Sequence, residues 1–210
     1  LDNPTDALVS TGNARFNGTV EVSRGIWQIN DNSSTSDLKI DILGDLTIDA
    51  NGSLEVSTAN ARHQLNLSGN FNNNGGTAKF TNRTTTDYTN EATDGIIDLN
   101  LINTSADQTL QVNGTTNFYR IEIAKQNITN IVTAIASDPS FFNLYGPANY
   151  DHDTGIDQLR DDPLLPTNQQ NLNALALYTG TFNIGPNIDI PVLSTGTSTN
   201  YLISKDASLI

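Results

Sequence analysis

Short runs in which apolar residues alternate with polar ones recur along most of the chain, and this pattern constrains the fold more than any other feature. Leu46 and Ile48 in DLTID and Leu54 and Val56 in SLEVS are typical. A period of two is that of a β-strand with one buried and one wet face, and helical periodicity is nearly absent. We therefore expect an all-β chain. The other residues expected to face inward are Val20, Val22, Leu65, Leu67, Ala78, Phe80, Leu99, Leu101, Leu110, Val112, Ile121, Ile123, Leu175, Leu177, Phe182, Ile184, Ile188 and Ile190.

The connections between the runs are rich in Asn, Gly and Asp, which tolerate left-handed backbone conformations. They are LGD at 43–45, ANG at 50–52, NNNGG at 72–76, VNG at 112–114 and NIGPN at 183–187. GDLTIDANGSLEVS and LSGNFNNNGGTAKFTN share one order of alternation, Asn-Gly corner and alternation. A period of roughly 20 residues predicts a right-handed parallel β-solenoid (β-helix) of roughly eight to ten coils. An antiparallel β-sandwich is the alternative, because Asn-Gly corners also form hairpins.

The stretch NFNNNGG at 70–76 gives this expectation its sharpest form. We expect Phe71 to be its one inward anchor, so that Phe71→Asp would disrupt the coil. Asn73 is expected to be a corner residue whose replacement has a mild effect.

One segment interrupts the alternation and divides the expected single domain. Residues 1–136 are predicted to form coils, 137–169 an irregular loop rich in proline, aromatic residues and aspartate, and 170–210 further coils. The chain starts without Met, and both ends stop within the alternating pattern. We therefore expect it to be a piece of a longer protein.

The composition limits the kinds of partner and of chemistry that we expect for this chain. The chain has 10 Lys plus Arg against 23 Asp plus Glu, a net charge of -13, which argues against nucleic acid or an anionic membrane as a partner. It has no cysteine, so disulfides, thiolate metal sites and cysteine nucleophiles are excluded. No apolar run approaches the roughly 18 residues of a membrane-spanning helix.

The order of these units resembles a family. GDLTIDANGSLEVS, LNLSGNFNNNGGTAKFTN, ADQTLQVNGTTNFYRIEIAKQN, LALYTGTFNIGPNIDI and NYLISKDASLI are similar to repetitive β-helical regions of very large Bacteroidetes cell-surface proteins. These include adhesins exported by type IX secretion and associated with gliding motility. The resemblance covers about residues 36–127 and 172–210. It implies a secreted, non-catalytic structural segment at the bacterial cell surface, whose partners are neighbouring domains and possible surface glycans or export machinery. It implies no catalytic residue.

The acidic stretch DHDTGIDQLRDD is the candidate metal site. Alternating carboxylates can turn toward one calcium ion, a hard cation that prefers oxygen ligands. The predicted ligands are Asp151, Asp153, Asp157 and Asp162. The match to a calcium loop is imperfect, because Gly155 comes one place early, and a solvated acidic loop is the competing interpretation. No other cofactor is expected.

Aromatic residues before this stretch are the candidate ligand-binding residues. Phe141, Tyr145 and Tyr150 could form a sugar-stacking platform. Alternatively, Phe141 packs with Phe142 and Leu144 to hold the loop against the solenoid flank. Were the protein instead a polysaccharide-binding or polysaccharide-cleaving β-helix, Arg160 among the aspartates would be its candidate base. No serine-hydrolase elbow or phosphate-binding loop is present.

Overall fold

A computed structural model describes residues 7–84, 95–102, 105–146, 174–190 and 201–210. Its named strands pair in parallel throughout, and the described residues contain no helix. The chain is thus a parallel β-solenoid, as predicted, and the antiparallel sandwich is ruled out. No helix among these residues is long and apolar enough to cross a membrane.

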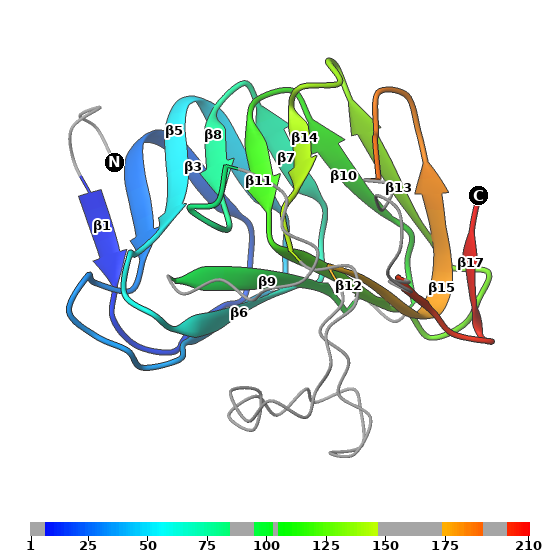
Figure 1. The fold of residues 1–210 in the computed structure, drawn as a ribbon, viewed down its shortest axis with the longest axis horizontal. Coiled ribbons are helices and arrows are strands. Elements are labelled where there is room, and N and C mark those ends of the chain that lie inside the picture. The colour runs from blue at the N-terminus through cyan, green and yellow to red at the C-terminus, as the bar shows by residue number, and fades with distance from the viewer. Residues whose placement is uncertain (1–6, 85–94, 103–104, 147–173, 191–200) are drawn as a thin grey trace, which may run out of the picture.

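The strands are mostly short, as the alternating runs predicted. They are β1 (Ala7–Ser10), β2 (Ala14–Phe16), β3 (Val20–Ile29), β4 (Lys39–Ile42), β5 (Leu46–Val56), β6 (Arg62–Leu67), β7 (Phe71–Asn74), β8 (Thr77–Lys79), β9 (Ile96–Leu101), β10 (Gln108–Val112), β11 (Thr116–Phe118), β12 (Arg120–Ala124), β13 (Ile131–Ala136), β14 (Phe142–Leu144), β15 (Leu175–Ile184), β16 (Leu202–Ile203) and β17 (Ala207–Leu209). Figure 1 shows them stacked along the long axis, from β1 at one end to β17 at the other.

Two parallel sheets form the walls of the solenoid. Sheet B stacks β2, β4, β6, β9, β12, the start of β15 and β16. Sheet A holds the remaining strands and the end of β15, and a corner divides it into two faces. Face A1 includes β7, β10 and β13, and face A2 includes β8, β11 and β14. Each coil therefore runs from sheet B to face A1 and then to face A2.

The repeat is longer than the sequence predicted. Leu46 of β5 pairs with Phe71 of β7, an offset of 25 residues. Within the described residues, seven strands stack in sheet B and eight levels stack in sheet A from β1 to β17, close to the lower end of the predicted eight to ten coils. The two similar units, GDLTIDANGSLEVS and LSGNFNNNGGTAKFTN, each hold the A1 and A2 strands of one coil. A sheet B strand and loops of unequal length lie between such units, and they make the repeat longer than 20 residues.

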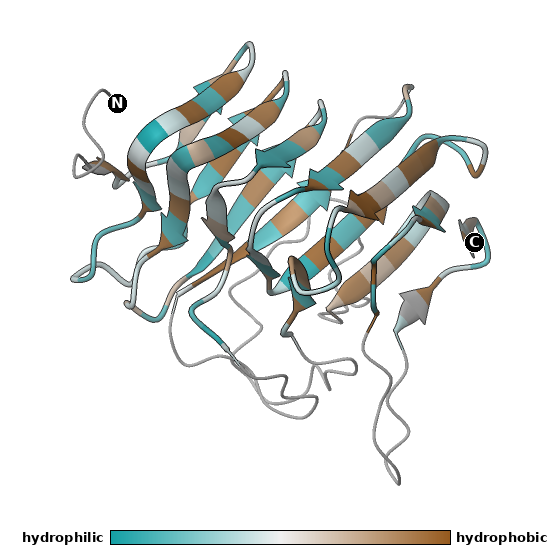
Figure 2. Ribbon diagram, turned by 90° about the horizontal axis from the view of Figure 1, so that it is seen from above, coloured by the Kyte–Doolittle hydropathy of each residue, from teal (hydrophilic) through white to brown (hydrophobic). Residues whose placement is uncertain are grey.

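The core is a set of apolar columns running through the coils. The residues expected to face inward are buried or packed against the core, and brown and teal alternate along the strands in Figure 2. Phe71 is fully buried, which confirms its inward position. Its ring lies 5.8 Å from that of Phe80 and 5.9 Å from that of Phe118, both edge-on. Stacked aromatic rings hold neighbouring coils together beyond their burial alone.

The predicted left-handed conformation is found at two corner residues, Gly75 and Asn187, but most corner glycines serve a different purpose. Among the described residues, positive φ angles occur only at Gly25, Gly75, Gly180, Asn30 and Asn187. Most corner glycines instead touch the preceding coil. A Cβ at Gly114 would lie 2.3 Å from the Gly76 carbonyl oxygen, and one at Gly69 would lie 2.4 Å from the Gly44 carbonyl carbon. These positions require glycine because consecutive coils approach too closely for a side chain.

Many Asn and Asp side chains at the corners bind the next coil. Asp37 Oδ1 accepts a hydrogen bond from the Arg62 backbone N–H (2.8 Å), and Asp45 Oδ1 accepts one from the Asn70 N–H (2.6 Å). The same contact joins Asn13 to Lys39, Asn32 to Thr58, Asn70 to Thr109 and Asp107 to Ile131. Each side-chain oxygen accepts a hydrogen bond from a backbone N–H group that has no partner in the pairing between strands.

The expectation for Asn73 was wrong. Its side chain is fully buried, with Nδ2 donating to Thr116 Oγ1 (2.9 Å) in the following coil. Its Oδ1 accepts from the Gly75 N–H at 3.2 Å. Asn73 occupies an inward position beside a corner, where unmade hydrogen bonds are costly, so its replacement is not expected to be mild.

Residues 137–146 belong to the solenoid, although they lie in the segment 137–169 predicted to be an inserted loop. Asp138 forms the corner, accepting hydrogen bonds from the Ser140 backbone and hydroxyl. Strand β14 then pairs with β11, and its Phe142 and Leu144 are buried in the core. They complete a coil instead of holding a loop to the flank. Residues 147–169 lie outside the described residues.

Candidate functional site

Most of the sequence-predicted site residues fall outside the described part of the chain. These are Asp151, Asp153, Asp157, Asp162, Tyr150 and Arg160. Within the described ranges, no group of three or more His, Asp or Glu side chains is placed to hold a metal ion.

Phe141 and Tyr145 are described, and they do not lie next to each other. They flank β14, four residues apart on an extended chain, which separates their Cα atoms by roughly 13 Å. Phe141 is half-buried and packs against the core. Tyr145 is also half-buried, and burial raises the pKa of its phenol.

Within the described residues, several carboxylate, amide and guanidinium side chains gather on the outer face of sheet B. Register places Asp41, Asn66, Asn100 and Glu122 in one column across β4, β6, β9 and β12. We call these four residues the polar ladder. The adjacent column places Asp98 of β9 beside Arg120 of β12.

Amide side chains connect the first three members of the polar ladder. Asn66 Nδ2 donates to Asp41 Oδ1 at 2.8 Å, and Asn100 Nδ2 donates to Asn66 Oδ1 at 2.9 Å. Asn66 and Asn100 are 3% and 1% exposed. The ladder therefore ties three successive coils together by side-chain hydrogen bonds, in addition to the backbone pairing.

Arg120 forms the charged end of this surface. Its Nη1 lies 2.6 Å from Glu122 Oε2, and its Nη2 donates to the Tyr178 hydroxyl at 3.0 Å. Arg120, Glu122 and Asp98 are all fully buried. A buried charge is stable only when it is paired and hydrogen-bonded, and here the guanidinium lies between a carboxylate and a phenol.

Sequence reasoning missed this cluster. RIEIA was recognised as an alternating run, but its polar residues were assigned to a wet face. Opposite charges at positions i and i+2 of one strand lie on the same face, so Arg120 and Glu122 were recognisable as a pair. Their complete burial was not, because alternation cannot reveal whether the outer face of a strand is covered.

A second buried polar contact lies at the corner between sheet B and face A1. Lys125 Nζ donates to Gln108 Oε1, and Gln108 Nε2 donates to the Leu67 and Gly69 carbonyl oxygens at 3.1 and 2.6 Å. Burial lowers the pKa of Lys125 to about 8, opposed by the negative charge of Asp107. The contact joins three coils at one corner.

A shallow pocket of about 480 Å³ lies along the same edge, toward the C-terminal coils. It is lined by Gln126, Asn127, Ile128, Thr179, Lys205 and Asp206. Lys205 and Asp206 pair with each other at 2.9 Å and are largely exposed. The pocket can accept a small polar molecule, but its charged side chains are not held in a fixed geometry.

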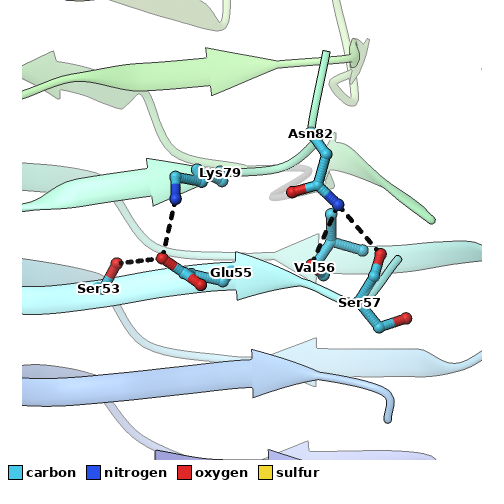
Figure 3. Close-up of polar contacts among 6 residues, drawn as sticks. All are labelled: Ser53, Glu55, Val56, Ser57, Lys79 and Asn82. Carbon is cyan, nitrogen blue, oxygen red and sulfur yellow. Dashed lines mark hydrogen bonds and ion pairs between the residues drawn. The ribbon is translucent and has the colours of Figure 1, made fainter. Parts of the chain in front are cut away.

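The outer surface of face A2 is polar and accessible. Lys79 Nζ lies 3.0 Å from Glu55 Oε1, which also accepts a hydrogen bond from Ser53 Oγ, as Figure 3 shows. At the end of the same face, Asn82 Nδ2 donates to the Ser57 carbonyl oxygen at 3.2 Å. These contacts again join neighbouring coils.

Comparison with known proteins gives no relative from which to transfer a role to these residues: no family model, no curated protein and no solved structure matches the chain.

Proposed function

We propose that this chain is a non-catalytic structural segment of a large secreted adhesin at the bacterial cell surface. Its role is to hold binding modules away from the cell, in surface attachment or gliding motility. Its partners are the neighbouring domains of the same protein, with surface glycans and the export machinery as further partners.

The observation that supports this proposal is that polar side chains form hydrogen bonds from one coil to the next. Asp37 and Asp45 bond to backbone groups of the next coil, and Asn66 and Asn100 bond to each other and to Asp41. Groups that could perform chemistry are thereby committed to holding one coil on another. This is the arrangement expected of a rigid spacer, because a solenoid is stabilised by contacts between neighbouring repeats.

Replacement in the source cells tests the spacer role. The segment is exchanged for an unrelated parallel β-solenoid with the same number of coils, and attachment of cells to a surface is measured. A spacer predicts that attachment persists after the exchange and falls when the segment is shortened by two coils. Loss of attachment with the equal-length replacement would assign binding to the segment itself.

Antibody labelling tests the location. An antibody raised against the folded segment should label intact cells, and deletion of the export system should abolish that label without removing the protein from cell extracts. Labelling that requires permeabilised cells would contradict the proposal.

Polysaccharide binding or cleavage is the second candidate. Its basis among the described residues is that Arg120, Glu122 and Tyr178 are brought together on the outer face of a parallel sheet, with Asp98 alongside. Arg120, Glu122 and Asp98 are fully buried, so this role requires that the site open to admit a sugar chain. A panel of acidic and neutral polysaccharides, assayed for chain shortening and for retention on the protein, tests this role. Activity that disappears in Glu122→Gln while the fold persists would favour the enzyme over the spacer.

A further inference from the structure

His63 is a fully buried histidine that the proposed scaffold role does not use. It is the second residue of β6 and pairs in register with Ile97 of β9. Alternation along β6 places it on the same face as Leu65 and Leu67, which are both in the core. An ionisable ring therefore lies at the inner edge of sheet B.

Hydrogen bonding fixes the protonation state of this ring. The Leu38 backbone N–H donates to His63 Nδ1 at 3.1 Å, so Nδ1 is the acceptor and Nε2 carries the proton. His63 Nε2 is buried and has no hydrogen-bond partner among the described residues. Protonation of Nδ1 would point a second N–H at the Leu38 N–H and would place a charge in the core.

Among the described residues, the nearby carboxylates are either already hydrogen-bonded or lie on the opposite face of the sheet. Asp37 precedes β4, and its Oδ1 already accepts from the Arg62 N–H. Asp98 of β9 lies one residue beyond Ile97, on the opposite face of the sheet. Arg62 and Lys39 add positive charge on β6 and β4. Burial lowers the pKa of His63 to about 4, against the opposing influence of Asp37 and Asp98.

We propose that His63 is an acid-sensitive latch between two coils, closed when its imidazole is neutral and opened when the ring gains a proton. The latch joins the corner at Leu38 to β6. Other contacts at this point include the hydrogen bond from the Gln64 N–H to the Leu38 carbonyl oxygen (2.8 Å) and the one from the Arg62 N–H to Asp37. Protonation of His63 disrupts the contact between these two coils first, while the backbone pairing of the strands on face A1 is unaffected.

The direction of the pH effect follows from the two pKa values. The folded pKa, about 4, lies below the ordinary histidine pKa of 6.5, so the unfolded chain binds the proton more tightly. The contribution is fully present above pH 6.5 and is lost progressively as the pH falls toward 4. Between pH 7.5 and 5 the latch alone lowers the folding equilibrium constant roughly 30-fold.

The test compares wild type with His63→Asn, whose Oδ1 occupies the acceptor position of Nδ1 but does not titrate. Urea unfolding is followed from pH 7.5 to 5, and His152→Asn, at the other histidine of the chain, is the control. Over this interval, the folding equilibrium constant of wild type and of His152→Asn should fall by a factor about 30 times larger than the factor for His63→Asn. Equal losses in all three proteins would overturn the proposal.

Two measurements on wild type do not depend on a variant folding. Nitrogen-15 spectra of labelled histidine should show His63 neutral at pH 5.5 with the proton on Nε2, and an ordinary titration near pH 6.5 would overturn the latch. Hydrogen exchange, corrected for the intrinsic effect of pH, should rise selectively at the Leu38 and Gln64 amides as the pH falls to 4.5. A uniform rise across both sheets would contradict local opening.

Discussion

The outer faces of sheets A and B each carry an ion pair, but the two pairs lie in opposite surroundings. On sheet A, Lys79 and Glu55 lie 3.0 Å apart with side chains 40% and 28% exposed. On sheet B, Arg120 and Glu122 lie 2.6 Å apart with both side chains fully buried. Water screens the first pair and makes it nearly neutral for stability, whereas the second pair is costly to break. Burial, and not the presence of a charge pair, decides what each contributes.

Removing one charge from the buried pair has the largest expected effect. Arg120→Ala leaves Glu122 buried without its guanidinium partner, and we expect a loss of about 3–5 kcal/mol in the free energy of unfolding. Urea denaturation measures this loss. The double variant Arg120→Met, Glu122→Leu should recover part of it, because the carboxylate of Glu122 is removed while that of Asp98, beside position 120, stays buried. A double variant as unstable as Arg120→Ala would show that the pair is required for more than charge balance.

Asn73 gives an intermediate effect on the inner side of face A1. Asn73→Ala removes the acceptor of the Gly75 N–H and the donor to Thr116, so we expect a loss of about 1–3 kcal/mol. Its neighbour Asn74 is exposed and bonds only at the surface, to Asp49 at 3.2 Å. Asn74→Ala, measured by the same denaturation, should change stability by less than about 0.5 kcal/mol. Equal effects at both positions would contradict the distinction.

A calcium titration tests the carboxylates of DHDTGIDQLRDD, which lie outside the described residues. If Asp151, Asp153, Asp157 and Asp162 bind calcium, a concentration ten times the dissociation constant should stabilise the protein by about 1.4 kcal/mol. Thermal melting with and without 10 mM calcium measures this, with magnesium as the control. The shift should vanish in a variant with all four aspartates changed to asparagine. No shift in wild type would remove the calcium proposal.

The exposed pair on sheet A should give the smallest effect. Lys79→Ala is expected to cost about 0.2–1 kcal/mol at low salt, and less when salt screens the pair. Denaturation at two ionic strengths measures both quantities. A loss as large as that of Arg120→Ala would mean that burial does not separate the two faces.

Much of the inner surface was predictable because a strand has a fixed period. Alternation identified Leu65, Leu99 and Ile121 as core residues, and all three are fully buried. The coil length was predicted less well, since loops of unequal length hide the sheet B strand between two similar units. The buried pair Arg120–Glu122 was not predicted, because RIEIA has the same alternation as a strand with a wet outer face.

The sequence by itself determined most of the strands and their inward faces, because these follow from local periodicity. Repetition favoured the parallel stacking of coils, and the strand pairing in the structure established it. Only the tertiary structure decided which polar side chains are buried and what the corner residues do. Gly114 is glycine because the preceding coil lies against it, and Asn73 bonds to Thr116 of the following coil. Such contacts join residues far apart in sequence, so they depend on the register between coils, which no single stretch of the chain encodes.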